Sequence, residues 1–236
     1  LQGRRVQCRL HRPSRGAPLP VLVYLHGGGW VTNSIDTHDR LARALAAESG
    51  WAVLSADYAM APEARFPVAV AECAALGRWL GDRAAGLGLD PDRIVLGGDS
   101  AGANLAIGAA LDLGPDAARL RGLLLFYGVY DARFDTPSYR EFDSGYGLTA
   151  ARMRTFWDLY APGDADRADP RCAPLRAASL AGLPPCLLLP AELDVLRSEG
   201  AAMAERLRRD GVAVSEHPTP GAPHGFARLV GRSAAA

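Results

Sequence analysis

Short runs of consecutive hydrophobic residues recur along the chain and are separated by stretches with helical periodicity. Uninterrupted runs of this kind are typical of strands that helices cover on both faces. They occupy residues 21–25, 52–54, 94–96, 123–126 and 186–189. Val6, Cys8 and Leu10 alternate instead with polar neighbours, which predicts an antiparallel edge strand. Val212 and Val214 mark the start of a last strand.

The helical periodicity between these runs predicts four helices. They cover residues 36–49, residues 67–81, a segment that begins at residue 100, and residues 197–209. Gly50 follows the first helix as a C-cap, and arginines fill the last turn of the fourth, where positive charge suits the helix dipole. Strands that alternate with helices in this way predict the α/β class, with a mostly parallel, doubly wound sheet.

The charge balance narrows the function classes. Lys and Arg together number 26, as do Asp and Glu, so the formal net charge of the 236 residues is +0. Such a chain has no broad positive field for nucleic acid or anionic lipid, and no apolar run approaches the roughly 20 residues of a spanning helix. Residues 1–15 are charged and lack the apolar core of a signal peptide. Four scattered cysteines without metal-site spacing favour a reducing, cytoplasmic compartment.

The sequence Gly98-Asp99-Ser100-Ala101-Gly102 matches the G-x-S-x-G motif. It follows a predicted strand and opens a predicted helix, and in that context the motif forms a sharp turn that exposes the serine. Glycines on both sides avoid Cβ clashes in such a turn, so Ser100 is a candidate nucleophile at the carboxyl edge of the sheet. The Ala101 N–H at the helix start would meet an oxyanion there. Alternatively, the serine only caps a helix.

A second glycine-rich segment, His26-Gly27-Gly28-Gly29-Trp30, follows the first buried run. Three successive glycines cost conformational entropy unless the backbone must come close to something. Backbone N–H groups directed at a substrate oxyanion supply such a reason. The alternative is a flexible turn. His26 is interpreted as an organiser of this loop rather than a proton carrier.

A serine hydroxyl needs a base that takes its proton, and imidazole has a suitable pKa. Among the five histidines, His224 stands in a Pro- and Gly-rich loop after the last predicted strand, where open sheets place catalytic groups. Without the other motifs, His224 would be interpreted as an ordinary surface histidine. The competitors are His11 near the chain start, His26 in the glycine segment, His38 in the first turn of a predicted helix, and His217 at the end of an edge-like run.

A carboxylate should fix the tautomer of the base and stabilise its protonated form. Asp194 follows the fifth hydrophobic run, precedes the fourth helix and lies 30 residues before His224. The order Ser100, Asp194, His224 is that of the α/β-hydrolase fold. Glu192, two positions earlier, is the rival, and either acid could instead be a solvated residue at a helix start. We favour Asp194.

The connection over residues 131–183 is unusually long. It takes about fifty residues to join two predicted strands, where an ordinary connection needs far fewer. Its helical stretch at 149–160 carries large apolar side chains at helix-face spacing, namely Met153, Phe156, Trp157 and Tyr160. We expect a single domain over residues 1–236 with a cap inserted at about 131–183 over the active site. Alternatively, the aromatic residues only pack the insertion onto the core.

These motifs together resemble the bacterial hormone-sensitive-lipase-like esterases, also called family IV, of the α/β-hydrolase superfamily. The similarity runs from about residue 20 to residue 226, and the combination of motifs is highly specific. In the family's order, the shared motifs are His26 to Trp30, Asp57-Tyr58, Ala61-Pro62-Glu63, Phe66-Pro67, Gly98 to Gly102, Asp194 with Leu196-Arg197 and Glu199-Gly200, and His224-Gly225-Phe226.

The resemblance implies an α/β-hydrolase fold and a bacterial serine carboxylesterase that hydrolyses short- to medium-chain esters through an acyl-enzyme, without metal or cofactor. The positions that match the family's functional residues are Ser100 for the nucleophile, His224 for the base, Asp194 for the acid, and Gly28, Gly29 and Ala101 for the oxyanion-hole donors. The candidate apolar walls of the substrate pocket are Trp30, Phe156, Trp157, Tyr160 and Phe226.

The chain departs from the family pattern in a few places. It has Ala59-Met60 where the family usually has Arg-Leu, and Val195 where the family usually has Pro. Neither departure falls on a candidate catalytic group. The family's N-terminal cap helices and its longer C-terminal helix are expected to be absent or to lie outside this sequence. If they are absent, the acyl pocket is expected to be more open.

Other activities remain open at this point. Amidases, thioesterases and aryl-formamide hydrolases use the same catalytic groups, and the sequence does not separate them from esterases. A binding protein is disfavoured, because the plant gibberellin receptors that resemble this family have lost the catalytic histidine, whereas His224 is present. The expected partner is a small-molecule ester. Nucleic acid and membrane insertion are not expected, and a homodimer stays open.

Overall fold

The centre of the molecule is a seven-stranded sheet. The computed structural model describes residues 4–14, 16 and 18–231, and the sheet has the order β1-β3-β2-β4-β5-β6-β8, beside a two-stranded sheet of β7 and β9. The strands of the large sheet are β1 (Gln7–His11), β2 (Leu19–Leu25), β3 (Ala52–Asp57), β4 (Leu89–Asp99), β5 (Leu120–Phe126), β6 (Cys186–Leu189) and β8 (Val214–Glu216). Those of the small sheet are β7 (Ala191–Leu193) and β9 (Thr219–Pro223).

Neighbouring strands of the large sheet run parallel, except that β1 pairs antiparallel with β3. This confirms the predicted parallel sheet and its antiparallel edge strand. The inner strands are hydrophobic along their length because both faces are covered, and Val21, Val23 and Leu25 of β2 are 0% exposed. The carboxyl ends of the parallel strands meet at one edge of the sheet, where catalytic groups collect in such folds.

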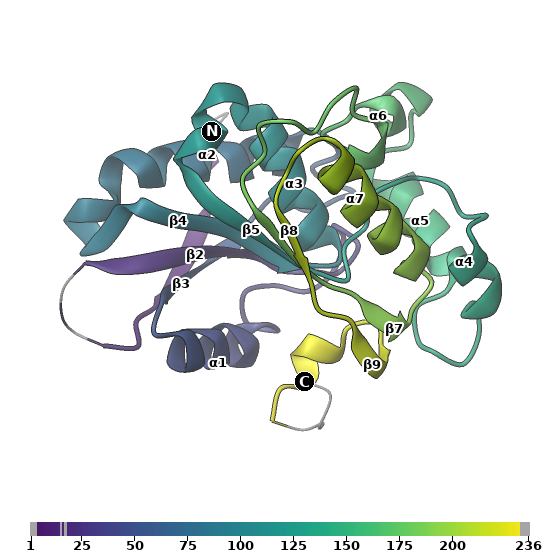
Figure 1. The fold of residues 1–236 in the computed structure, drawn as a ribbon, viewed down its shortest axis with the longest axis horizontal. Coiled ribbons are helices and arrows are strands. Elements are labelled where there is room, and N and C mark those ends of the chain that lie inside the picture. Colours follow the sequence, from purple (N-terminus) through teal and green to yellow (C-terminus); the bar gives the residue numbers. More distant parts are fainter. Residues whose placement is uncertain (1–3, 15, 17, 232–236) are drawn as a thin grey trace.

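Helices form the outer layers, with α2, α3 and α7 on one face of the sheet and α1 on the other (Figure 1). The helices are α1 (Asp39–Ser49), α2 (Val68–Arg83), α3 (Ala101–Leu113), α4 (Pro137–Glu141), α5 (Ala150–Tyr160), α6 (Asp164–Ala168) and α7 (Arg197–Arg209). Short 3-10 helices are η1 (Ala84–Leu87), η2 (Gly114–Arg119), η3 (Pro174–Arg176) and η4 (Phe226–Leu229). The fold is the predicted doubly wound α/β arrangement.

Helix α1 begins three residues later than the periodicity predicts. The Ser34 N–H donates to Thr37 Oγ1 at 3.0 Å, and the Thr37 hydroxyl donates to the Ser34 carbonyl at 2.8 Å. These local bonds hold a turn in place of the first helical residues. His38 is therefore not in the first turn of the helix but directly before it, with its ring buried. Gly50 caps the other end with φ 71°, as predicted.

The two strands of the small sheet are not predicted. The segment of β9 reads Thr-Pro-Gly-Ala-Pro, a composition typical of a loop, and β7 has only three residues. Their parallel pairing carries the backbone beyond the end of β6 and brings residue 223 beside residue 193. His224 therefore follows directly on a strand rather than standing in a free loop.

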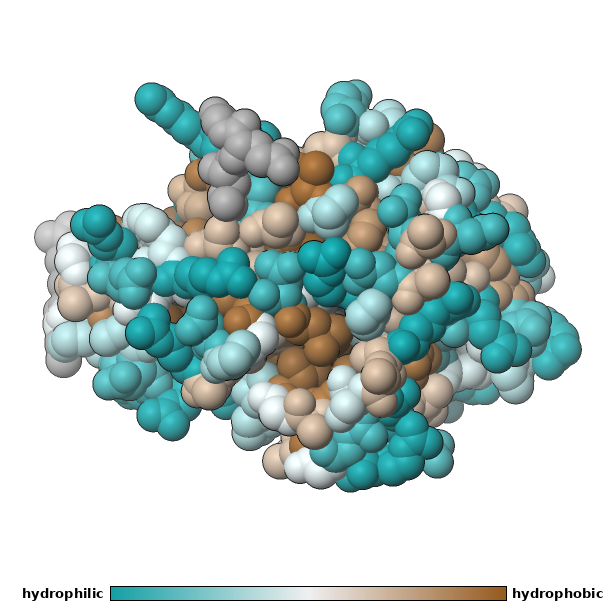
Figure 2. All heavy atoms as spheres, turned by 90° about the horizontal axis from the view of Figure 1, so that it is seen from above, coloured by the Kyte–Doolittle hydropathy of each residue, from teal (hydrophilic) through white to brown (hydrophobic). Residues whose placement is uncertain are grey.

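Residues 131–183 contain α4, α5, α6 and η3, and α4 and α5 lie near the carboxyl end of the sheet (Figure 1). Figure 2 shows a largely hydrophilic face with hydrophobic residues gathered near its middle. Across the described part of the chain, no helix is both long and apolar enough to cross a membrane. The outermost ends of the predicted domain, residues 1–3 and 232–236, lie outside the described residues.

Candidate active site

Ser100 occupies the junction between β4 and α3. Its backbone has φ 55° and ψ −116°, a positive φ that residues with a Cβ rarely adopt. The Ser100 N–H donates to the Phe126 carbonyl at the end of β5, at 2.9 Å, which holds the turn. A Cβ at Gly102 would overlap the Leu25 carbonyl, so glycine lets α3 lie against β2. The Ser100 hydroxyl makes no capping bond to α3.

The hydroxyl of Ser100 meets an imidazole instead. His224 Nε2 lies 3.0 Å from Ser100 Oγ, and His224 Nδ1 lies 2.7 Å from Asp194 Oδ2. The Ser100 side chain is nearly buried, and Asp194 is 2% exposed. With Nδ1–H donating to the carboxylate, Nε2 is the acceptor for the Ser100 hydroxyl. The arrangement can withdraw a proton from the hydroxyl and stabilise the imidazolium that results.

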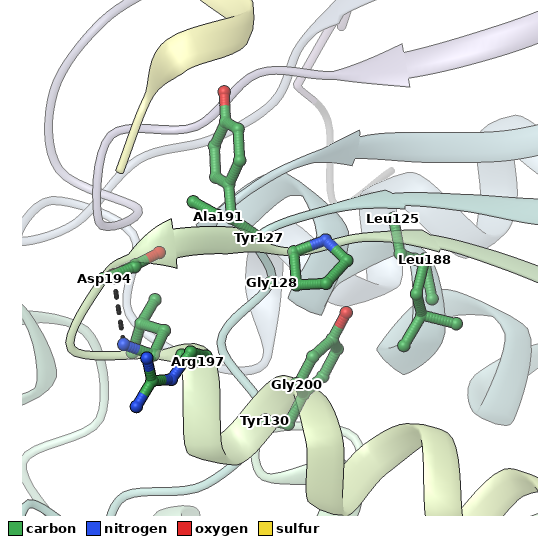
Figure 3. A pocket seen from close by; sticks show the side chains of 11 residues that line it. Leu125, Tyr127, Gly128, Tyr130, Leu188, Ala191, Asp194, Arg197 and Gly200 are labelled. Atoms are coloured by element: carbon green, nitrogen blue, oxygen red, sulfur yellow. Dashed lines mark hydrogen bonds between the residues drawn. The ribbon is translucent and has the colours of Figure 1, made fainter. Parts of the chain in front are cut away.

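Asp194 is fixed from its second oxygen as well, because Oδ1 accepts the Leu196 N–H at 3.0 Å. Figure 3 shows this bond as a dashed line, with Asp194 beside a small pocket that β5, β6 and α7 enclose. The rival acid, Glu192, accepts the Gly221 N–H at 2.6 Å and thereby joins β7 to β9. Among the described residues, only Asp194 pairs with His224.

The glycine segment lies opposite this hydroxyl. Gly28 and Gly29 line a cavity of about 450 Å³ together with Ser100 and His224. Neither glycine donates its N–H to an acceptor within the described residues. Ala101 is the first residue of α3, so its N–H has no partner inside its own helix. Three N–H groups are therefore unused near the candidate nucleophile.

A buried network around Asp99 links the two glycine motifs, and sequence reasoning missed it. Asp99 Oδ1 accepts the Tyr24 hydroxyl at 2.8 Å and the Gly27 N–H at 2.8 Å, and His38 Nε2 lies 3.2 Å from it. Burial alone would raise the pKa of Asp99, but His38, Tyr24 and Gly27 outweigh it and lower the pKa to about 2. One charged carboxylate thus joins the residue before Ser100 to the loop of unused N–H groups.

His26 also organises this loop, as predicted. Its ring stacks on Tyr58 with centroids 4.5 Å apart, and its Nδ1 lies 2.9 Å from the Gly27 carbonyl. The Tyr58 hydroxyl donates to the His26 carbonyl at 2.6 Å. Burial lowers the pKa of His26, which keeps the imidazole neutral in this packed position.

A second network ties α4 to the turn after β7. Ser138 of α4 donates its hydroxyl to the Val195 carbonyl at 2.6 Å and accepts the Ser198 N–H at 3.1 Å. Glu199 Oε2 accepts the two N–H groups of residues 130–131, at 2.8 and 3.0 Å. Burial raises the pKa of Glu199 to about 8, and these N–H bonds offset only part of that rise. The backbone at residues 130–131, α4 and the Asp194 turn are therefore joined by hydrogen bonds.

The cavity wall differs from the predicted one. Its apolar lining consists of Leu148, Met153, Phe156 and Leu229, and its polar lining includes Thr32, Asn33, Arg152 and Arg228. Of the five predicted wall residues, only Phe156 is among them. Trp30 stacks on Tyr160 with centroids 4.4 Å apart, and these two rings and Trp157 are 0% exposed. Phe226 packs on Tyr127 and is buried. The rings of Trp30, Trp157 and Tyr160 therefore pack together in the core, and Phe226 packs separately against Tyr127.

Comparison with known proteins decides the family. The sequence profile of the alpha/beta hydrolase fold family matches residues 22–228. The chain belongs to this family. It is 39% identical to the ethyl acetate hydrolase of Pseudomonas putida, over 96% of this chain and 73% of that protein. It is 39% identical to the carboxylic ester hydrolase LipN of Mycobacterium tuberculosis, over 95% of this chain and 61% of that protein.

Solved structures agree with the family. The chain superposes on a thermophilic, thermostable carboxylesterase cloned from a metagenomic library with a TM-score of 0.94 at 37% identity, over 100% of this chain and 83% of that one. The resemblance of this α/β hydrolase to the hormone-sensitive-lipase-like esterases is thereby confirmed. One fold can carry many activities, so the activity depends on the site. In this chain the site consists of the hydrogen bonds that join Ser100, His224 and Asp194, together with the glycine loop.

Proposed function

We propose that this α/β hydrolase cleaves short- to medium-chain carboxylic esters through an acyl-enzyme on Ser100. It is a carboxylic ester hydrolase, the class to which its 39% identical relatives belong. The observation that carries the mechanism is the continuous path from Ser100 Oγ through His224 to Asp194, with distances of 3.0 and 2.7 Å. The cavity of about 450 Å³ lies within the range of about 300–1,000 Å³ common for small-molecule sites.

In the first step, Ser100 Oγ attacks the ester carbonyl while its proton passes to His224 Nε2. Asp194 stabilises the imidazolium and keeps Nδ1–H directed at its carboxylate. The imidazolium then gives the proton to the departing alkoxide, the ester C–O bond breaks, and the acyl group stays on Ser100. In the second step, a water attacks the acyl carbonyl, His224 takes its proton and returns one to Ser100 Oγ, and the carboxylic acid leaves.

The carbonyl oxygen becomes negatively charged in both steps and needs donors that are already in place. Gly28, Gly29 and Ala101 are proposed to donate their unused N–H groups to it, a role in which each donor is worth about 10²–10³ in rate. Phe156 is proposed as an acyl wall. The segment 131–183 is proposed to cap the cavity, since Leu148, Met153 and Phe156 line it from that segment.

The test is the acyl-enzyme itself. The protein should release p-nitrophenol from p-nitrophenyl butyrate in a burst, and a fluorophosphonate probe should label one serine. Ser100→Ala should lose both the burst and the label, whereas the exposed Ser49→Ala should keep both. Hydrolysis that survives in Ser100→Ala would refute the assignment. A panel of amide and thioester substrates separates the esterase from enzymes with the same catalytic groups.

The compartment and the assembly state are part of the proposal as well. Cysteines 73, 172 and 186 are buried and free, and Cys8 is free as well, which supports the reducing bacterial cytoplasm that the sequence predicts. Burial raises the pKa of the Cys186 thiol to about 12, so that thiol is held in its unreactive form. Sedimentation analysis would show whether the homodimer left open by the sequence forms.

A further inference from the structure

Two arginines line the cavity that contains the candidate nucleophile. Arg152 comes from α5 and Arg228 from η4, and both appear in the wall beside Ser100 and His224. Neither forms an ion pair with a carboxylate anywhere in residues 4–14, 16 and 18–231. Two elements far apart in the sequence therefore bring unneutralised positive charge to one cavity.

The carboxylates around this cavity are already engaged. Asp99 is held by His38, Tyr24 and Gly27, and Asp194 is held by His224. The positive charge of the wall is therefore local, because the whole chain has a formal net charge of +0.

The surroundings of Arg152 direct its charge along an apolar wall. The guanidinium carbon lies 5.9 Å from the centroid of the Phe156 ring, an arrangement in which the cation faces the ring. Met153, the next residue, lines the same cavity and is buried. A ligand that extends along Phe156 would meet a guanidinium, whose planar donors match a carboxylate.

We propose that the preferred substrates are esters that carry a carboxylate elsewhere in the molecule, bound by Arg152 and Arg228. The inference rests on the proposed ester hydrolysis and names its substrate class. Because the cavity is open to water and salt, each charge contributes modestly. The two arginines together should give a preference of about tenfold in kcat/KM, which equals about 1.4 kcal/mol.

The test compares matched esters in a pH-stat. Monomethyl glutarate against dimethyl glutarate places the charge on the acyl side, and acetylated lactate against sec-butyl acetate places it on the alcohol side. The ratio of kcat/KM, anionic over neutral, should fall about tenfold in Arg152→Gln/Arg228→Gln for at least one pair. The ratio in the wild type should also fall as salt is added. Arg154→Gln is the control, since Arg154 lies over Phe134, 4.5 Å from its centroid, and does not line the cavity.

The outcomes separate the inference from the function. If neutral esters are hydrolysed and both ratios are the same in the wild type and the double variant, the inference is overturned while ester hydrolysis stands. If no ester is turned over and Ser100 takes no fluorophosphonate, the proposed function fails as well. All three arginines are exposed, so the variants should fold, which circular dichroism would verify.

Discussion

The substitution Gly29→Ala adds one methyl group to the glycine loop and tests how closely this loop packs against the cavity wall. The backbone there has φ +60°, where an alanine costs about 1–2 kcal/mol. An added Cβ would lie 2.6 Å from Phe156 Cδ1 and nearer still to Cγ, whereas ordinary contact begins at 3.4 Å. Either the ring or the loop must therefore move by about 1 Å.

A shift of this size matters because the loop carries proposed oxyanion donors. Displacement by about 1 Å in a reacting geometry costs about 10²-fold in rate, so Gly29→Ala should lower kcat on p-nitrophenyl butyrate about 100-fold. The matched control is Gly50→Ala, at the end of α1. Its φ is +71° with nothing within 4 Å of the added Cβ. It should lose similar stability in urea unfolding and keep the wild-type kcat.

A double-mutant cycle tests the cause. Phe156→Ala removes the ring that the new methyl group would meet, so Gly29→Ala should cost less kcat in that background than in the wild type. Gly28→Ala cannot be rescued in this way, because its Cβ would overlap the backbone carbonyl of Thr32. The Phe156 ring does not fix the position of the loop if Gly29→Ala keeps kcat within about threefold of the wild type. The same conclusion follows if the effects of Gly29→Ala and Phe156→Ala on kcat simply multiply in the double variant.

Two further predictions concern carboxyl groups. Asp194→Asn should lower kcat by about 10⁴ through the wrong imidazole tautomer. Glu192→Gln should keep kcat near wild type, because Glu192 contacts Gly221 rather than His224 and the amide oxygen can still accept the Gly221 N–H. Equal losses in both variants would contradict the assignment. Glu199 has a pKa raised to about 8 from its usual 4.5, so its stabilising contribution is full below about pH 4.5 and is lost as the pH rises through about 8. The free energy of unfolding of the wild type, measured by urea unfolding, should therefore fall between these pH values, and Glu199→Gln should remove that fall. An unchanged pH dependence in the variant would refute this.

The strands of the large sheet could be predicted because burial on both faces requires an uninterrupted run of hydrophobic residues, which is visible in the sequence. The run at residues 21–25 is hydrophobic without interruption, and it forms the strand between β3 and β4. The segments of β7 and β9 contain no such hydrophobic run. Its residues include two prolines and a glycine, and the strands exist only because β7 and β9 lie side by side after folding.

The pocket wall could not be predicted for a related reason. Phe156 and Trp157 are neighbours on one helix and equally apolar, yet one ring lines the cavity and the other is 0% exposed. Residue type and helical spacing suit both roles equally well. Only the position of α5 assigns each ring, and Trp30 fixes that position by stacking on Tyr160 and meeting Trp157 edge-on, both of which belong to α5.

The Asp99–His38 pair shows why two motifs far apart in sequence act as one site. In the register of β2 and β4, Leu25 lies opposite Gly98, so the glycine loop and the Ser100 turn leave the sheet at the same level. Parallel pairing alone would leave the two backbones free to separate beyond their last shared bond. The Asp99 carboxylate closes that gap by accepting the Gly27 N–H, and buried His38 keeps it charged. A hydrogen bond between one residue of each motif therefore holds the glycine loop beside the Ser100 turn, and His38, which lies outside both motifs, contacts the same carboxylate.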